Sequence, residues 1–160
     1  MKIINQSQKR RYKNIDKTVN KLLKSIPGEH LLGLDSLILA DDIFNKGYED
    51  CRGLYWPKKG LKKARIEIGL NNIFKNQSKM VFVPYLGKYA LARILFHEIG
   101  HHVKEMKHGI SKNDEEYFAE QYSKKYSQLA LKNWDFLLTP LKPLLMFLGK
   151  KYLKWKKIEF

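Results

Sequence analysis

The feature that most constrains this chain is the segment His97-Glu98-Ile99-Gly100-His101, which has the pattern H-E-x-x-H. Its two histidines can act together on an α-helix, because helical residues four apart project from the same face. There the imidazole nitrogens can converge on one Zn²⁺, and Glu98 between them can reach a water on the metal. The pattern therefore predicts a helix with a metal site built on it.

The residues around the motif favour this helix. The stretch 89–96 has apolar residues at helical spacing and contains neither Gly nor Pro, which is typical of a buried helix. After the motif, Lys104 and Lys107 suit the C-terminal turn of a helix, and Gly109 suits the position that ends it. Residues 111–114 resemble an N-cap followed by an acidic side chain, so we expect a second helix to begin there.

A catalytic zinc usually has three protein ligands and a water, so one more ligand is needed. A third histidine in the pattern H-E-x-x-H-x-x-G-x-x-H is excluded, because Lys104 and Lys107 occupy the glycine and histidine positions. Glu116 and Glu120 lie four residues apart and share one face of the expected second helix. One can bind the metal while the other accepts a hydrogen bond from a ligand histidine. We expect Glu116 to be the ligand, with Glu120 as the alternative.

At these residues the chain resembles the gluzincin class of zinc metallopeptidases. In gluzincins a glutamate ligand follows H-E-x-x-H on a later helix, often in the sequence E-x-x-A-D or E-x-x-A-N. This chain has E-Y-F-A-E at 116–120. Uncharged residues at 94–96 and 103 also match positions that zincins keep around the motif. The resemblance covers about residues 36–126 and is greatest to the compact, single-domain gluzincins of archaea and bacteria, the minigluzincins. It implies zinc-dependent peptide-bond hydrolysis with Glu98 as general base and His97, His101 and Glu116 as ligands. Glu120 would accept a hydrogen bond from a ligand histidine and orient it.

The predicted fold class is α+β and zincin-like. We expect a small, mostly antiparallel sheet packed on the motif helix and the glutamate-bearing helix, with extra terminal helices. Strand-like segments are 35–41, 53–56 and 64–70, the last two flanking a turn at 57–60. Polar and apolar residues alternate in 64–70, as in a half-exposed edge strand. Because zincins bind substrate as an added strand above the metal, the resemblance implies that Ile66, Glu67 and Ile68 bind substrate.

Length and composition favour a single domain over residues 1–160. Hydrophobic residues make up 44% of the chain, which argues against disorder. Cys51 is the only cysteine, so no disulfide can form within the chain, and nothing marks an oxidising compartment. The first residues lack the apolar core of a signal peptide. We therefore expect a cytoplasmic protein.

The net charge of +15 is concentrated at the two ends of the chain. Residues 1–24 carry eight Lys and Arg against one Asp, and residues 124–160 carry nine Lys against two acids, so each end has a charge of +7. We expect residues 1–27 to form a basic N-terminal helix and 127–160 a basic, apolar C-terminal extension. Such arms suit nucleic acid or an anionic membrane surface. The alternative function is therefore a non-enzymatic, basic nucleic-acid-binding or interaction protein with a structural metal site.

The apolar run at 137–148 is the most ambiguous part of the extension. It is short and is broken by Pro140, Lys142 and Pro143, so we do not expect it to span a bilayer. It can pack as core, lie at a membrane interface or cover the active-site cleft. Compact gluzincins are sometimes made as latent forms with a terminal segment over the cleft, so the resemblance makes latency possible here. Core packing is the role we favour.

Overall fold

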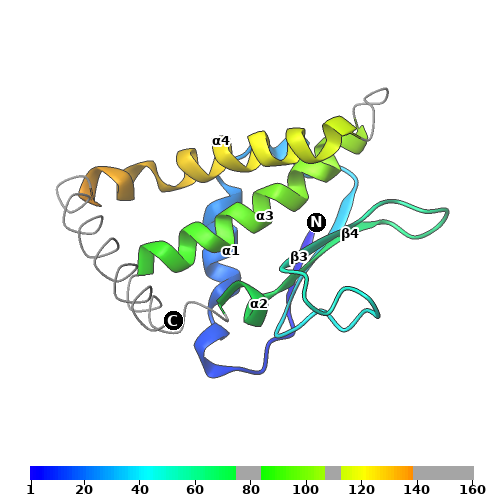
Figure 1. Cartoon of the computed structure of the whole chain (residues 1–160), viewed down its shortest axis with the longest axis horizontal. Helices are drawn as coiled ribbons and strands as arrows, with labels where there is room; N and C mark the ends of the chain where they lie inside the picture. The colour runs from blue at the N-terminus through cyan, green and yellow to red at the C-terminus, as the bar shows by residue number, and fades with distance from the viewer. Residues whose placement is uncertain (75–83, 107–112, 139–160) are drawn as a thin grey trace, which may run out of the picture. The chain divides into compact units, whose positions relative to one another are not determined.

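The computed structural model describes residues 1–74, 84–106 and 113–138, without the side chains of residues 11, 84, 85, 113 and 133–138. The fold is α+β, as the sequence predicts, with four strands in one mixed sheet and four α-helices (Figure 1). Contacts divide the chain into Met1–Ala130 and Leu131–Phe160, and the fold described below belongs to the first unit. The strands are β1 (Lys2–Asn5), β2 (Leu34–Ala40), β3 (Gly53–Trp56) and β4 (Ala64–Gly69). The helices are α1 (Ile15–Leu23), α2 (Leu70–Phe74), α3 (Pro84–Met106) and α4 (Asn113–Leu138), with short 3₁₀ turns at Arg10–Tyr12 and Gly28–Leu31.

The sheet has the strand order β1-β2-β4-β3. β1 pairs with β2 and β2 with β4 in parallel, and only β3 pairs with β4 in antiparallel fashion. The expectation of a mostly antiparallel sheet is therefore wrong. Parallel neighbours need a crossover connection, and α1 lies in the connection between β1 and β2.

β4 lies inside the sheet, so the expectation that residues 64–70 form an edge strand is also wrong. It pairs with β2 on one side and with β3 on the other. The alternation in β4 reflects the two faces of the sheet, since Ile66 and Ile68 are fully buried and Arg65 and Glu67 form an ion pair on the opposite face. With both edges of β4 paired, Ile66, Glu67 and Ile68 have no free backbone to offer a substrate strand. The free edge near α3 belongs to β3.

The basic N-terminal segment is only partly helical. The helix is confirmed at Ile15–Leu23, where Val19, Leu22 and Leu23 are buried and form its apolar stripe. Residues 2–5 instead form β1, whose alternating exposure is that of an edge strand. The sequence K-I-I-N has β-branched residues at its centre, which favours the strand.

α3 is the central helix of the first unit. It contacts β3, β4, α1 and α2, and its residues Leu91, Leu95 and Ile99 have no exposed surface. Phe96 is equally buried, so apolar residues surround the motif from more than one direction. The helix predicted from residues 89–96 is confirmed. In the part of the chain that the structure describes, no helix is both long and apolar enough to cross a membrane.

Candidate metal centre

The two motif histidines lie on one face of α3, as their spacing predicts. Their rings approach edge to face, with 4.7 Å between centroids and 3.1 Å between the two Nε2 atoms. Both rings are mostly shielded from solvent, with 25% of the His97 side chain and 12% of the His101 side chain exposed. Burial, followed by the neighbouring His101, lowers the pKa of His97 below its ordinary range. A neutral imidazole is the form that binds a metal.

A close helix crossing brings α4 to this face of α3. Gly100 lies between the two histidines in the sequence, and a Cβ added to it would lie 2.7 Å from Cα of Ala119. Two small residues therefore let the backbones approach more closely than larger side chains would permit. Figure 1 shows the first turns of α4 next to the C-terminal part of α3. These turns carry Glu116, whose carboxylate contacts both histidines.

Glu116 completes a group of three possible donor residues with His97 and His101, called the donor triangle below. One of its carboxylate oxygens lies 3.4 Å from Nε2 of His97, and the other lies 3.4 Å from Nε2 of His101. His97, His101 and Glu116 are a group that could hold a metal ion, with donor atoms all within 4.8 Å of one another. The Glu116 side chain remains 75% exposed, so the group faces solvent on the α4 side.

The spacing of this triangle fits zinc. Tetrahedral ligands with bonds of about 2.0–2.1 Å lie about 3.3 Å from one another. The distance of 3.1 Å between the two Nε2 atoms is close to that value, and so is the 3.4 Å from each Nε2 to its own Glu116 oxygen, the two contacts being made by different oxygens of the carboxylate. Two imidazoles and one carboxylate are also one of the common sets of protein ligands in zinc sites that keep a position for water or substrate.

Glu115 makes the contact with a motif histidine that we expected of Glu120. Its Oε1 lies 3.1 Å from Nδ1 of His101. A carboxylate at Nδ1 favours the tautomer in which Nδ1 carries the proton. The lone pair of Nε2 is then available to a metal ion held between His101 and the other two donor residues. The only signal for this role in the sequence is that Glu115 directly precedes the expected ligand, and three consecutive acidic residues also suit an ordinary helix start.

Glu120 pairs with Arg93 instead of with a histidine. Its Oε1 lies 2.5 Å from Nη2 of Arg93, one turn before His97, and 3.5 Å from Nζ of Lys124. The hydrogen bond from Arg93 holds the pKa of Glu120 below its usual range, so the carboxylate is ionised. The structure thus corrects the expectation for Glu120, which joins α3 to α4 one turn away from the donor triangle.

Glu98 lies on the side of α3 that faces the sheet, with only 8% of its surface exposed. β3 passes so close that a Cβ on Gly53 would lie 2.7 Å from Glu98 Oε1 and 2.7 Å from Ile94 Cγ2. Burial and then the charge of Glu116 raise the pKa of Glu98 to about 7, and a backbone N–H from Tyr55 partly offsets the rise. Glu98 can therefore exchange a proton near neutral pH.

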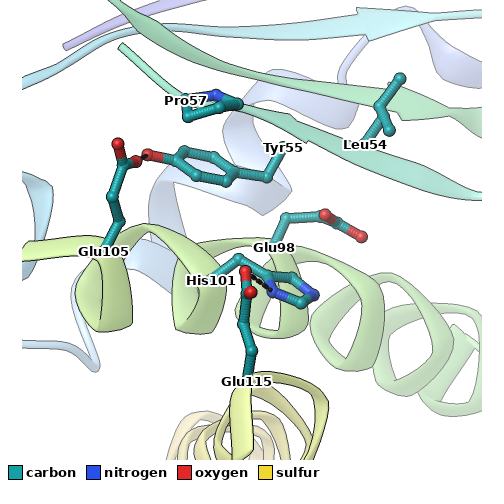
Figure 2. Close-up of a pocket in the computed structure, with 7 residues that line it drawn as sticks. All are labelled: Leu54, Tyr55, Pro57, Glu98, His101, Glu105 and Glu115. Carbon is teal, nitrogen blue, oxygen red and sulfur yellow. Dashed lines mark hydrogen bonds and ion pairs between the residues drawn. The ribbon is translucent and has the colours of Figure 1, made fainter. Parts of the chain in front are cut away.

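A cavity of about 380 Å³ opens beside Glu98 and His101, between β3 and the two helices. Figure 2 shows Leu54, Tyr55 and Pro57 on the β3 side, with Glu98, His101 and Glu105 on α3 and Glu115 on α4. The Tyr55 hydroxyl donates to Glu105 and lies 3.1 Å from Nδ1 of His102. Burial, followed by the Glu105 carboxylate, raises the pKa of Tyr55, so its hydroxyl stays protonated. These contacts tie β3 to α3 at one end of the cavity.

The structure thus brings His97, Glu98, His101 and Glu116 together and separates them from the residues expected to bind substrate. Ile66, Glu67 and Ile68 lie in β4, the neighbour of β3 in the sheet, and they are not among the residues that line this cavity. The predicted helix end at Gly109 and the segment 139–160, which was considered as a cover for the cleft, lie outside the described residues.

Comparison of the chain with protein-family models, with curated proteins and with solved structures finds no match.

Proposed function

We propose that this protein is a zinc-dependent metallopeptidase. The observation that carries the proposal is that the His97 and His101 Nε2 atoms and the Glu116 carboxylate lie together, at distances close to those between the ligands of tetrahedral zinc. His97, His101 and Glu116 would hold the ion. Zinc, when bound, supplies Lewis acidity, which polarises a carbonyl group and makes a water acidic near neutral pH.

Glu98 would be the general acid and base of the reaction. It adjoins the donor triangle, lines the cavity and has a pKa of about 7, which suits a group that must both take and release a proton at neutral pH. In this role its carboxylate takes a proton from the attacking water and passes it to the leaving amine. Burial on the β3 side limits the access of bulk water to the carboxylate.

The substrate would lie along β3. This strand has its free edge next to the cavity, and an extended peptide can add to such an edge through backbone hydrogen bonds. Gly53 fixes the distance between this edge and Glu98, because no larger residue fits between them. A peptide paired with residues 53–56 would therefore pass over Glu98 and the donor triangle.

The donor set also favours a catalytic role over a structural one. Structural zinc usually has four protein ligands, often including several cysteines, whereas the group found among the described residues has three members and no cysteine.

The test compares wild-type protein with Glu98→Gln on a mixture of unstructured peptides, with cleavage read by mass spectrometry and zinc by elemental analysis. We expect Glu98→Gln to keep its zinc and to lose activity by about 10²–10⁴-fold. Glu29→Gln, the same change at an exposed position, should keep both. Equal cleavage by wild type and Glu98→Gln would refute the proposal.

A further inference from the structure

The connection between β3 and β4 is a basic hairpin with an apolar tip. Within residues 57–63 the side chains at 58, 59, 62 and 63 are lysines, and all are exposed. Lys63 also pairs with Asp35 at 3.5 Å, at the start of β2. Leu61, at the tip, has a relative exposure of 102%, which means that it contacts almost nothing in the protein.

The hairpin holds this leucine in a defined place. Lys59 and Lys62 exchange two backbone hydrogen bonds of 3.1 Å around the two-residue turn Gly60-Leu61. Gly60 has φ +59°, the left-handed value that the first residue of such a turn requires. Leu61 therefore lies in a turn whose ends are joined by two backbone hydrogen bonds. Figure 1 shows the connection projecting beyond the ends of β3 and β4.

From this arrangement we infer that the β3–β4 hairpin docks on an anionic lipid bilayer. Such a surface offers negative headgroups to the lysines and, just beneath them, an apolar layer that can take up Leu61. Nucleic acid offers phosphates to the lysines but no comparable apolar layer for an isolated leucine. The positive net charge of the whole chain adds to the attraction.

Docking at this place would bring the candidate metal centre close to the lipid. Pro57, directly after β3, lines the cavity and lies only four residues from Leu61. At about 3.3 Å per residue, the extended chain from Pro57 at the cavity to Leu61 at the tip is on the order of 13 Å long. The docking itself does not depend on peptidase activity, and its test uses no substrate.

The experiment measures binding of the full-length protein to phosphatidylcholine vesicles with and without phosphatidylserine, by co-sedimentation. We expect binding only to the anionic vesicles. Leu61→Asn, which keeps a residue suited to the turn, should weaken it about tenfold, since it removes one apolar anchor. Replacing the four hairpin lysines with Gln should weaken it about 600-fold, at about fivefold for each lysine near the surface.

The matched control replaces four exposed lysines of α1 and its flanks, Lys13, Lys17, Lys21 and Lys24, with Gln. It removes the same charge and should weaken binding far less. Wild-type affinity in both hairpin variants, or an equal loss in the α1 control, would overturn the inference. So would tight binding to duplex DNA that needs the hairpin lysines, combined with vesicle binding that is indifferent to Leu61. Thermal unfolding of each variant shows whether it remains folded.

Discussion

Gly100 of α3 lies against Ala119 of α4 with no room for a Cβ between them, since an added Cβ would approach Cα of Ala119 to 2.7 Å. Gly100 directly precedes His101 and follows His97 by three residues, and Ala119 follows Glu116 by three residues. The distance between the helices at this point therefore sets the size of the donor triangle.

Gly100→Ala should force α3 and α4 apart. We expect it to destabilise the protein by about 1–3 kcal/mol, the usual effect of overpacking, and to weaken zinc binding because Glu116 moves away from the histidines. Gly87→Ala on the same helix is the control, because its Cβ would meet only Phe74 at an ordinary 3.5 Å. It should be neutral or stabilising by up to about 1 kcal/mol. Denaturant unfolding and zinc titration of both variants measure these effects, and unchanged zinc affinity in Gly100→Ala would contradict this account of the crossing.

Glu115 and Glu116 should affect zinc to different degrees. Glu115→Gln keeps the three ligands but weakens the hold on Nδ1 of His101, so we expect zinc affinity to fall about 10–100-fold. Glu116→Gln removes the ligand carboxylate and should have the larger effect. Asp114→Asn changes the same charge in the same turn and should have little effect. Competition with a chromophoric chelator gives the three affinities, and the reverse order for Glu115 and Glu116 would exchange their roles.

Glu98 should make the stability of the metal-free protein depend on pH. Its folded-state pKa is raised to about 7 from an ordinary value of 4.5, so its contribution to folding is fully present below about pH 4.5 and is lost as pH rises through 7. That shift corresponds to about 3 kcal/mol. Glu98→Gln has no such titration, and its stability relative to wild type should rise by about this amount between pH 4 and pH 8. Unfolding in the presence of a chelator measures the difference in free energy of unfolding between Glu98→Gln and wild type. A difference that stays constant from pH 4 to pH 8 would contradict this prediction.

Tyr55→Phe should loosen the contact between β3 and α3. The change removes the hydroxyl that donates to Glu105 and leaves Nδ1 of buried His102 without that partner, at a cost of about 1–3 kcal/mol. Tyr48→Phe, at a side chain that is 42% exposed, is the matched control and should change the free energy of unfolding by less than about 0.5 kcal/mol. If chemical denaturation gives the same loss for both, the Tyr55 contacts do not hold the strand.

The parts of the candidate site that follow from local sequence were predictable. Four-residue spacing places His97 and His101 on one helical face, and an acidic helix start after the turn supplies Glu116. The segments expected as strands are β2, β3 and β4 with bounds shifted by at most one residue. Each of these inferences depends on residues that are neighbours along the chain.

The errors concern contacts between distant segments. The alternation of polar and apolar residues in 64–70 shows that one face of the strand is buried. It does not show whether the strand has one neighbour or two, so β4 was expected to be an edge strand, whereas it pairs with both β2 and β3. Glu120 was expected at a histidine because it shares a helical face with Glu116. Its partner in the structure, Arg93, lies 27 residues earlier on another helix, so spacing along the chain could not reveal the pair. Gly100 was a signal available inside the motif itself, because glycine in a helix interior costs stability unless a close packing contact requires it.

The most direct test of the central claim is a zinc titration of activity. Protein stripped with a chelator should be inactive on unstructured peptides, and activity should rise in proportion to added zinc until one equivalent per chain is bound. His101→Ala should neither bind this equivalent tightly nor regain activity. Full activity in the stripped protein, or tight binding of one zinc by His101→Ala with wild-type activity, would contradict the assignment of a catalytic zinc to His97, His101 and Glu116.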